Sequence, residues 1–364
     1  MVSVGVLGLA LMLSMSSGLG RFMSWAMIAA FRRGPKLAVF SAVVSAAVLA
    51  LAGCAGKPYG VPRAAPGFPI VTSGYFHLAD GAVLPYRLYP ARGRLGAVVL
   101  ALHGYTDSRD GWAMLAKVLN AHGIAVYAPD QSGFGATPDR GAWPGTARLV
   151  DEARDMSVLL RRKYPDQKLF VAGESMGGAI GLLLGASADP PPVDGYILSA
   201  PAVWGGAALG PFYHAVLDMA DTFVPGMRLT GQAAHVLASD NIAALIAFSR
   251  DPLTLLGPTV ANIAGMVRLM GDAQAACAAL HEPALILYGG HDELIPKAAM
   301  RRCWDAIPRR APVTLAYYPP DYHLITRDLE RATPDADILG YILGTGPVSS
   351  APSEATVFLA SGAF

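Results

Sequence analysis

The chain has 364 residues, of which 53% are hydrophobic and 15% are charged. This length and composition can bury a large core and exclude an intrinsically disordered chain. The formal net charge is +1, from 28 Lys and Arg against 27 Asp and Glu, so no excess of positive charge attracts a nucleic-acid backbone. We therefore expect one large catalytic domain that carries an insertion, and no nucleic-acid partner.

Residues 1–53 are predicted to be a signal or anchor segment. Residues 31–54 read FRRGPKLAVFSAVVSAAVLALAGC, in which positive charges precede an uncharged apolar run and then small residues, the order of a secretory signal. A second apolar stretch, residues 2–19, stands before this signal. Two explanations stay open. Either translation starts at Met23 or Met27, which makes residues 1–26 a misassigned start, or the first stretch is a genuine extra hydrophobic segment.

The end of this segment, Leu-Ala-Gly-Cys at residues 51–54, resembles the lipobox of bacterial lipoproteins. The resemblance implies that Cys54 carries lipid and attaches the protein to a membrane in the bacterial cell envelope. Because Ala55 and not Asp follows, it implies the outer membrane, facing the periplasm. An uncleaved membrane anchor, or a chance Leu-Ala-Gly-Cys in an Ala-rich sequence, stays open as the alternative.

Residues 54–73 are predicted to be a tether between the anchor and the enzyme. They include the run KPYGVPRAAPGFPIVTS, whose prolines and glycines cannot propagate a helix. The folded domain is expected to begin near Tyr75. Beyond Cys54 the chain has only two cysteines, Cys277 and Cys303. They are either a disulfide pair in an oxidising compartment or two separate buried thiols, and the sequence leaves this open.

From residue 74 onward, apolar β-type runs alternate with helix-like spans. The expected strands are a hairpin within 74–90 and single runs at 96–102, 124–128, 168–173, 195–199, 284–288 and 313–318. The expected helices are 111–121, 146–163, 176–185, 296–306 and 327–343. This alternation predicts an α/β fold with a mainly parallel, eight-stranded sheet flanked by helices, whose active site lies at the carboxyl ends of the strands.

The alternation fails over residues 203–279, where segments rich in Met, Leu and Ala follow one another without a clear strand. Helices inserted after one strand are typical of a lid or cap over the strand ends. The catalytic core is accordingly expected at residues 74–202 and 280–344. The last residues, 345–364, are mostly small and polar, which predicts a mobile tail.

Gly173-Glu174-Ser175-Met176-Gly177 matches the G-x-S-x-G pattern of a serine nucleophile. In a chain with 40 glycines the pattern alone is weak evidence. Its setting is more specific, because Ser175 stands where an apolar β-type run passes into a helix-like one, as in a nucleophile elbow. That sharp turn requires small neighbours, which accounts for Gly173, Gly177 and Gly178. We therefore expect Ser175 to be the nucleophile.

A serine hydroxyl needs an adjacent base, which is itself held by an acid. In this strand-turn-helix class the chain order is serine, acid, histidine. The histidines in the right region are His281, His291 and His323, and choosing Asp292 as the acid leaves only His323 downstream. Asp292 and His323 each follow a strand-like run directly, as Ser175 does. We predict a triad of Ser175, Asp292 and His323.

Acyl transfer also requires hydrogen-bond donors for the oxygen that becomes negative. His103 and Gly104 follow another buried strand, and in this fold the loop after that strand supplies one backbone N–H while the residue after the nucleophile supplies the other. These donors would be Tyr105 and Met176. A plain turn at His103-Gly104 is the alternative.

The sequence resembles the monoacylglycerol lipases and bacterial lysophospholipases of the α/β-hydrolase superfamily. This likeness spans residues 74–344 and rests on the motifs HGYTD (103–107), PDQSGFGAT (129–137), GESMGG (173–178), GGHDELIP (289–296) and DYHLITRD (321–328). The resemblance implies an α/β-hydrolase fold with a helical cap after the sixth strand and the hydrolysis of single-chain acyl glycerol esters. The cap carries no family signature, so the substrate is the least specified part.

The expected function is thus a serine hydrolase that cleaves carboxylic esters of single-chain lipids through an acyl-enzyme on Ser175. No metal or cofactor is implied, since the sequence holds no H-E-x-x-H, cysteine cluster or P-loop lysine motif. Two alternatives remain. One is a peptidase or acyltransferase on the same fold, and the other is a catalytically inactive lipid-binding lipoprotein.

Overall fold

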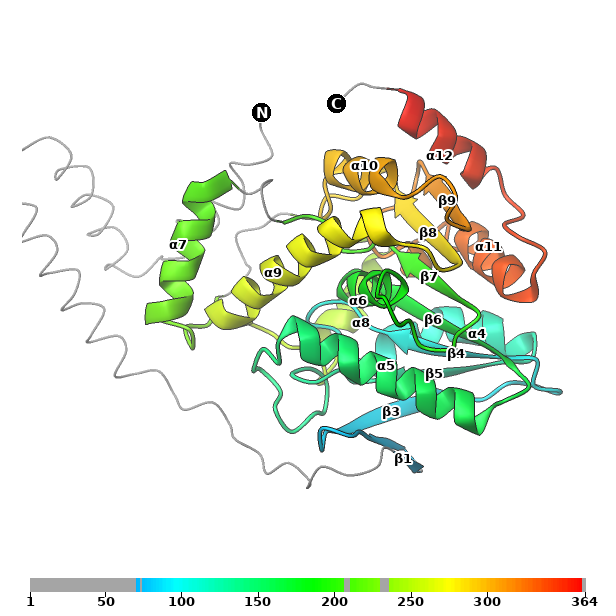
Figure 1. Ribbon diagram of the computed structural model, residues 1–364, viewed down its shortest axis with the longest axis horizontal. Coiled ribbons are helices and arrows are strands. Elements are labelled where there is room, and N and C mark those ends of the chain that lie inside the picture. Colours follow the sequence, from blue (N-terminus) through cyan, green and yellow to red (C-terminus); the bar gives the residue numbers. More distant parts are fainter. Residues whose placement is uncertain (1–69, 73, 206–209, 230–235, 362–364) are drawn as a thin grey trace, which may run out of the picture. The chain divides into compact units, whose positions relative to one another are not determined.

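The computed structural model describes residues 70–72, 74–205, 210–229 and 236–361. Contacts divide the chain into two compact units, and the larger one, residues 59–208, 236–255 and 265–364, holds the whole sheet (Figure 1). The signal segment, Cys54 and most of the predicted tether lie outside the described residues. None of the helices in the described ranges is long and apolar enough to cross a membrane.

A nine-stranded sheet forms the centre of the larger unit, in the order β1-β2-β3-β5-β4-β6-β7-β8-β9. The strands are β1 (Ile70–Thr72), β2 (Tyr75–His77), β3 (Val83–Tyr89), β4 (Ala97–Leu102), β5 (Ile124–Pro129), β6 (Lys168–Glu174), β7 (Gly195–Ser199), β8 (Ala284–Gly289) and β9 (Val313–Tyr318). The strands from β5 to β9 in this order pair in parallel, whereas β1, β2 and β3 are joined by antiparallel pairings. This arrangement confirms the predicted mainly parallel α/β sheet.

The sheet has one strand more than the eight that the sequence predicts. The extra strand is β1, at residues 70–72, which were expected to belong to the tether. It pairs antiparallel with β2, with Val71 opposite Phe76. The Ile-Val-Thr run consists of β-branched residues, which favour a strand. It was assigned to the tether because the residues before it are rich in proline and glycine. Without β1, the strand β7 is the sixth of the predicted eight.

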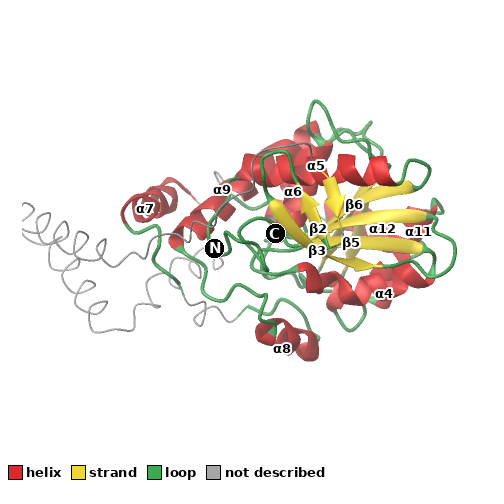
Figure 2. Ribbon diagram, turned by 90° about the horizontal axis from the view of Figure 1, so that it is seen from below, coloured by secondary structure: helices red, strands yellow, loops and turns green. Residues whose placement is uncertain are grey.

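Helices cover both faces of the sheet because successive strand residues point to opposite sides. In β4, Val98, Leu100 and Leu102 pack on one face with the helices α5 (Thr146–Lys163), α6 (Met176–Gly185) and α10 (Lys297–Ala306). The alternate residues of β4 pack on the other face with α4 (Ala113–Ala121) and α11 (Ala332–Leu343). Figure 2 shows these two helical layers on either side of the strands.

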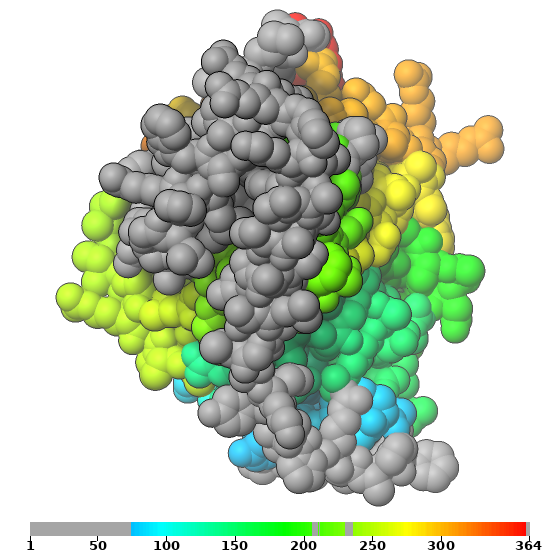
Figure 3. Space-filling model, turned by 90° about the vertical axis from the view of Figure 1, so that its left-hand side faces the viewer, coloured from blue at the N-terminus to red at the C-terminus, as the bar shows by residue number. Residues whose placement is uncertain are grey.

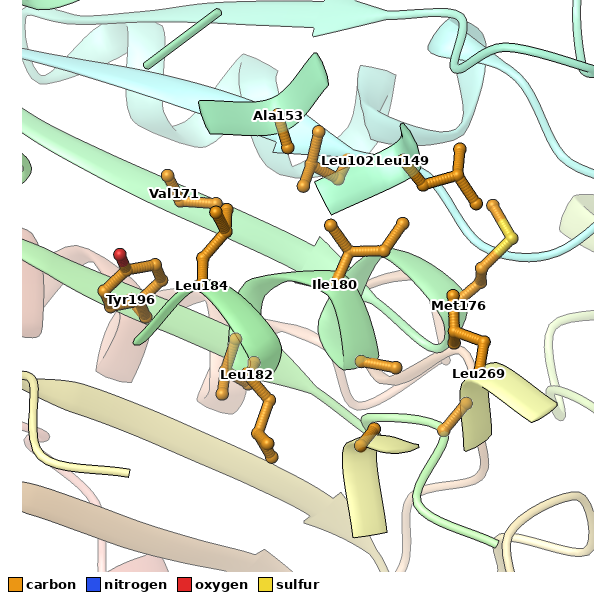
Figure 4. Packing of buried hydrophobic residues seen from close by; sticks show 14 of the residues in the cluster. Leu102, Leu149, Ala153, Val171, Met176, Ile180, Leu182, Leu184, Tyr196 and Leu269 are labelled. Carbon is orange, nitrogen blue, oxygen red and sulfur yellow. The ribbon is translucent and has the colours of Figure 1, made fainter. Parts of the chain in front are cut away.

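The helix α6 is apolar on all sides because it lies between the sheet and other helices. Figure 4 shows Ile180, Leu182 and Leu184 of this helix among Leu149 and Ala153 of α5 and residues of the central strands. All of these side chains are buried. The first turn of α6 directly follows Ser175, so the packing of the helix fixes the position of that turn.

The helices α5 and α6 begin and end where the sequence predicts, but α11 begins at Ala332 and not at residue 327. Pro334 explains the difference. A proline is tolerated only in the first turn of a helix, since further in it removes a backbone hydrogen bond. The preceding residues form a short 3-10 turn, η4 (Ile325–Arg327), and a loop.

The C-terminal segment 345–364, predicted to be a mobile tail, contains the helix α12 (Ala351–Ala360). Its residues Ala351, Ala355 and Phe358 are buried, a spacing of four and three that places them on one helical face. The ring of Phe358 stacks on Tyr317 with centroids 4.6 Å apart. The prediction of a mobile tail was therefore wrong for this helix, whose apolar spacing was present in the sequence. Figure 3 shows the surface of α10 and α12, in orange and red, side by side.

The insertion after β7 is helical in its described residues. It contains α7 (Gly210–Phe223), α8 (Ile242–Arg250), α9 (Val260–Ala276) and the 3-10 turn η3 (Cys277–Ala279). The helix α7 belongs to the smaller unit and α8 to the larger. The boundaries of these units differ from those of the predicted cap, residues 203–279.

A disulfide joins Cys277 of η3 to Cys303 of α10, with their Cα atoms 5.3 Å apart. Both residues are fully buried. This bond answers the question that the sequence left open. It closes a loop that contains β8 and the residues around Asp292, so the end of the insertion is covalently tied to the helix that follows the Asp292 loop.

Candidate active site

Ser175 lies in the sharp turn between β6 and α6, as the sequence predicts. Its φ of 53° and ψ of −109° are unusual for a residue with a side chain. Such a conformation costs about 1–3 kcal/mol and persists only where the surroundings impose it. Here the Ser175 N–H donates to the Ser199 carbonyl at 2.9 Å, and its own carbonyl accepts from Ala179 and Ala202. The fold therefore holds Ser175 in the geometry of a nucleophile elbow.

The glycines around Ser175 have no room for a side chain. A Cβ at Gly173 would meet the Gly177 carbonyl, and a Cβ at Gly177 would meet the Leu102 carbonyl, both inside van der Waals distance. A Cβ at Gly178 would lie 3.0 Å from the Cα of Pro201. The elbow thus packs backbone against backbone, which explains the three small residues that the sequence places there.

Asp292 and His323 lie on the loops that follow β8 and β9, which are adjacent parallel strands. The His323 Nδ1 and the Asp292 Oδ2 are 2.8 Å apart, and both side chains are almost completely buried. The other carboxylate oxygen of Asp292 accepts from the backbone N–H groups of Leu294 and Ile295. With the carboxylate held in this way, Nδ1–H donates to it and leaves Nε2 of His323 as the free acceptor.

The electrostatic surroundings of His323 favour its protonated form. Burial lowers the pKa of His323, but the Asp292 charge and hydrogen bond, together with the charge of Glu174, outweigh burial and raise it. The charge of Arg327 opposes this rise. A base whose pKa is raised in this way accepts a proton more readily, as general-base catalysis requires.

The predicted oxyanion donors, Tyr105 and Met176, lie on two segments that touch. A Cβ at Gly104 would be 3.5 Å from the Cβ of Ser175, so the loop after β4 rests against the elbow. Within the described part of the chain, neither the Tyr105 N–H nor the Met176 N–H donates to another residue. Met176 is the first residue of α6, where backbone N–H groups have no partner inside the helix. Both N–H groups are thus available to a ligand.

His103 is buried and stabilises the loop that carries Tyr105. Its Nε2 accepts from the Gln131 N–H at 3.1 Å, so Nδ1 carries the hydrogen and donates to the Gly104 carbonyl at 2.8 Å. Burial lowers the pKa of His103, which keeps the ring neutral and preserves this tautomer. His103 therefore shapes the loop and is not a second base.

The other candidate histidines, His281 and His291, are both exposed, and His281 Nε2 lies 3.7 Å from Oε1 of Glu282. His281 Nδ1 bonds the Ala279 carbonyl and His291 Nδ1 bonds the Pro320 carbonyl, both at exposed positions. No group of three or more His, Cys, Asp or Glu side chains in the described ranges could hold a metal ion.

Sequence reasoning missed the charged side chains that join these loops. Arg327 donates to Glu174, the residue before Ser175, and to Asp107, two residues after Tyr105. Asp328 accepts from the N–H of Tyr322, next to His323. All four residues belong to the motifs named above. Their role follows from the burial of their charged side chains, which cannot be predicted without the fold.

Comparison with known families gives the chain's place among hydrolases. Residues 93–330 match the family described as Serine aminopeptidase, S33. The chain belongs to this family. The match begins before β4 and ends after η4, so it includes every predicted site residue except Cys54.

Among the relatives of this chain, the monoglyceride lipase of Mus musculus is 26% identical over 258 residues, which cover 70% of this chain and 84% of the relative. A phospholipase of Bacillus subtilis is 23% identical over 217 residues, 58% of this chain and 82% of the relative. These relatives are lipolytic enzymes rather than aminopeptidases, although the family is named for a peptidase.

Solved structures of lipases have the same fold as this chain. The monoacylglycerol lipase of Paleococcus ferrophilus is 20% identical with a TM-score of 0.60, covering 72% of this chain and 99% of its own. A soluble variant of the monoglyceride lipase of Saccharomyces cerevisiae, in complex with a substrate analogue, is 19% identical with a TM-score of 0.63, covering 80% and 99%. The fold is an α/β-hydrolase fold, and the chain is a carboxylic ester hydrolase of the lipase and esterase group.

Proposed function

We propose that this enzyme hydrolyses the carboxylic ester of single-chain lipids, such as monoacylglycerols and lysophospholipids, through an acyl-enzyme on Ser175. The observation that carries the proposal is the buried 2.8 Å pair of His323 and Asp292, on the same edge of the sheet as the strained turn of Ser175. An imidazole oriented by a carboxylate at this edge is what a serine hydroxyl needs to become a nucleophile.

In the first step the Ser175 Oγ attacks the ester carbonyl while Nε2 of His323 takes the hydroxyl proton. The charge that develops on the carbonyl oxygen is stabilised by the N–H groups of Tyr105 and Met176. His323 then gives its proton to the departing alcohol, and the acyl group stays on Ser175. Water, deprotonated by His323, attacks the acyl-enzyme and releases the fatty acid, which restores the serine hydroxyl.

The substrate class is supported by the relatives and not by a bound ligand. Monoglyceride lipases of mammals and yeast, and a bacterial phospholipase, share the fold or the sequence along most of their length. A monoglyceride, the lipid named for the mammalian and yeast relatives, carries one acyl ester next to a polar glycerol group. We therefore propose an ester with a single long acyl chain as the substrate.

The test is a hydrolysis panel that runs from short-chain esters to long-chain monoacylglycerol, lysophospholipid and triacylglycerol. We expect the single-chain lipids to give the highest kcat/KM, and Ser175→Ala to abolish activity on every ester. A preference for triacylglycerol would contradict the proposed substrate class. Persistent activity of Ser175→Ala would contradict the mechanism.

The name of the family supports a second candidate, a serine aminopeptidase with the same triad. An aminopeptidase must bind the free α-amino group of its substrate. The discriminating assay compares amino-acid arylamides with acyl esters of the same leaving-group class. Release of arylamine at a rate comparable to ester cleavage would favour the peptidase, whereas ester cleavage alone favours the lipase.

We further propose that Cys54 is acylated and holds the enzyme at the outer membrane of a bacterial envelope, with its catalytic domain in the periplasm. Support comes from the signal-like sequence and the Leu-Ala-Gly-Cys at its end. The mass of the mature N-terminal peptide would show the lipid on Cys54. We expect Cys54→Ser to leave the membrane fraction, and its unchanged retention there would contradict this anchor.

A further inference from the structure

Three charged side chains, Asp107, Glu174 and Arg327, form a buried cluster next to the candidate triad. Their side chains are only 5%, 3% and 8% exposed, respectively. Ionised side chains are rarely buried to this extent without a role, because taking a charge out of water costs several kcal/mol. The mechanism above gives none of the three a chemical step, so their burial needs another explanation.

One nitrogen atom holds the cluster together. Nη2 of Arg327 donates to Oε1 of Glu174 at 2.7 Å and also donates to Oδ2 of Asp107. Burial raises the pKa of Glu174, and the positive charge of Arg327 opposes that rise and stabilises the carboxylate. The contact with Arg327 thus fixes the direction of both acidic side chains.

The three residues stand close in sequence to the candidate catalytic groups, Glu174 as the last residue of β6 and the other two after β4 and β9. Glu174 precedes the nucleophile Ser175 directly, and Asp107 follows the oxyanion donor Tyr105 by two residues. Arg327 is in η4, four residues after the base His323. These segments stand at the ends of β6, β4 and β9. The guanidinium joins them at one point, although Arg327 and Asp107 are 220 residues apart along the chain.

The surrounding chain contacts the cluster on two sides. A Cβ on Gly111 would lie 2.5 Å from both the Arg327 Nη2 and the Asp107 Oδ2, so only glycine fits there. On its other side, the Arg327 carbonyl accepts from Asn241 Nδ2 at 2.8 Å, which ties the histidine loop to the part of the insertion just before α8. Arg327 is therefore held both by its side chain and by its backbone carbonyl.

We propose that Arg327 is a positioning residue, which sets the distances between nucleophile, oxyanion donor and base by pairing with Glu174 and Asp107. It touches no reacting atom. Reacting groups displaced by about 1 Å lose up to about 100-fold in rate. Without the guanidinium, Glu174 and Asp107 would lose the donor that they share, and this link between their segments would be absent.

This inference rests on the proposed function, since it assigns Arg327 a part in the same acyl transfer. It predicts a specific kinetic signature. Binding of the substrate depends on contacts with its acyl chain and head group, whereas the spacing of the catalytic groups matters in the transition state. A loss of spacing lowers kcat and leaves KM nearly unchanged.

The test uses the full chain with Arg327→Met and Arg327→Lys and measures kcat and KM. The concentration of active sites, by which kcat is normalised, is determined by titration with a fluorophosphonate. We expect Arg327→Met to lower kcat by about 30- to 100-fold with KM within about threefold. Lysine keeps the charge and one hydrogen bond, so Arg327→Lys should recover part of the loss. Thermal unfolding measured in parallel shows that each variant is folded at the assay temperature.

Arg148→Met is the matched control. Arg148 is a partly buried arginine that pairs with Asp80, Asp139 and Glu152, and it touches none of the three loops. We expect this variant to lose stability but to keep its kcat per active site.

If Arg327→Met does not fold, Arg327→Lys and Glu174→Gln provide the measurement, since each keeps a polar group in place. A kcat within threefold of the wild type in every folded variant would overturn the proposal. An inactive Ser175→Ala alongside unaffected Arg327 variants would refute the positioning role alone, whereas an active Ser175→Ala would refute the proposed function itself.

Discussion

The disulfide between Cys277 and Cys303 makes a stability prediction that follows from its loop length. The cysteines are 26 residues apart. For a closed loop of that size the chain-entropy relation gives about 12 cal/mol/K, or about 3.5 kcal/mol at 25 °C. An unfolding entropy of roughly 2.1 cal/mol/K per residue over about 290 folded residues converts this free energy to a Tm decrease of about 6 °C.

Two samples measure this effect differently. Wild type refolded in dithiothreitol keeps both buried sulfur atoms, so its Tm isolates the effect of the covalent link. In the double variant Cys277→Ala/Cys303→Ala both sulfur atoms are removed from the core, so we expect a decrease at least as large. Differential scanning calorimetry of oxidised wild type, reduced wild type and the variant provides the comparison. Reductant should not change the Tm of the variant.

A reduced wild type that unfolds within 1 °C of the oxidised protein would refute this reasoning. That result would mean that the end of the insertion and α10 stay together in the unfolded chain, or that the link does not form. Free-thiol titration of the unfolded, non-reduced protein separates the two, since a formed disulfide leaves Cys277 and Cys303 unreactive.

Three further predictions concern the site and its surroundings. Gly177→Ala should abolish activity and destabilise the fold, because its Cβ would meet the Leu102 carbonyl; activity above a tenth of the wild type would contradict this packing. His323 must be neutral to act as a base and its pKa is raised, so kcat/KM should fall on the acid side with a midpoint above the ordinary histidine value. Asp292→Asn removes the anion that raises the pKa and should move that midpoint to lower pH; an unmoved midpoint would mean that another group titrates. Asp321 is buried near Asp328 and other acids, which raises its pKa to about 7. The folded state therefore holds a proton that the unfolded chain has released, so stability should fall from about pH 4 to pH 7, and urea midpoints should show a weaker fall in Asp321→Asn.

The positions of the strands along the chain, and of Asp292 and His323 directly after two of them, could be predicted from sequence because both depend on local patterns. Strands buried on both faces read as continuous apolar runs, as at residues 97–102 and 284–289, and both were found. Polar residues directly after such runs, such as Asp292 and His323, were expected at one edge of the sheet, and the structure brings this pair into contact.

Features that depend on distant contacts could not be predicted. The sequence does not show that Arg327 is buried against Glu174 and Asp107, because each residue looks like an ordinary charge beside a motif. The pairing of Cys277 with Cys303 depends likewise on a distance in space. By contrast, α12 had a readable signal in the spacing of its apolar residues, which its small and polar neighbours obscured.

The central claim is that the hydroxyl of Ser175 is the attacking nucleophile and that His323 activates it. The most direct measurement is the reaction of the full chain with a fluorophosphonate, followed by the mass of the intact protein and of its peptides. We predict one adduct per chain, located on Ser175, absent from Ser175→Ala and formed at least 100-fold more slowly in His323→Ala. An adduct on another residue, or an undiminished rate in His323→Ala, would contradict the account.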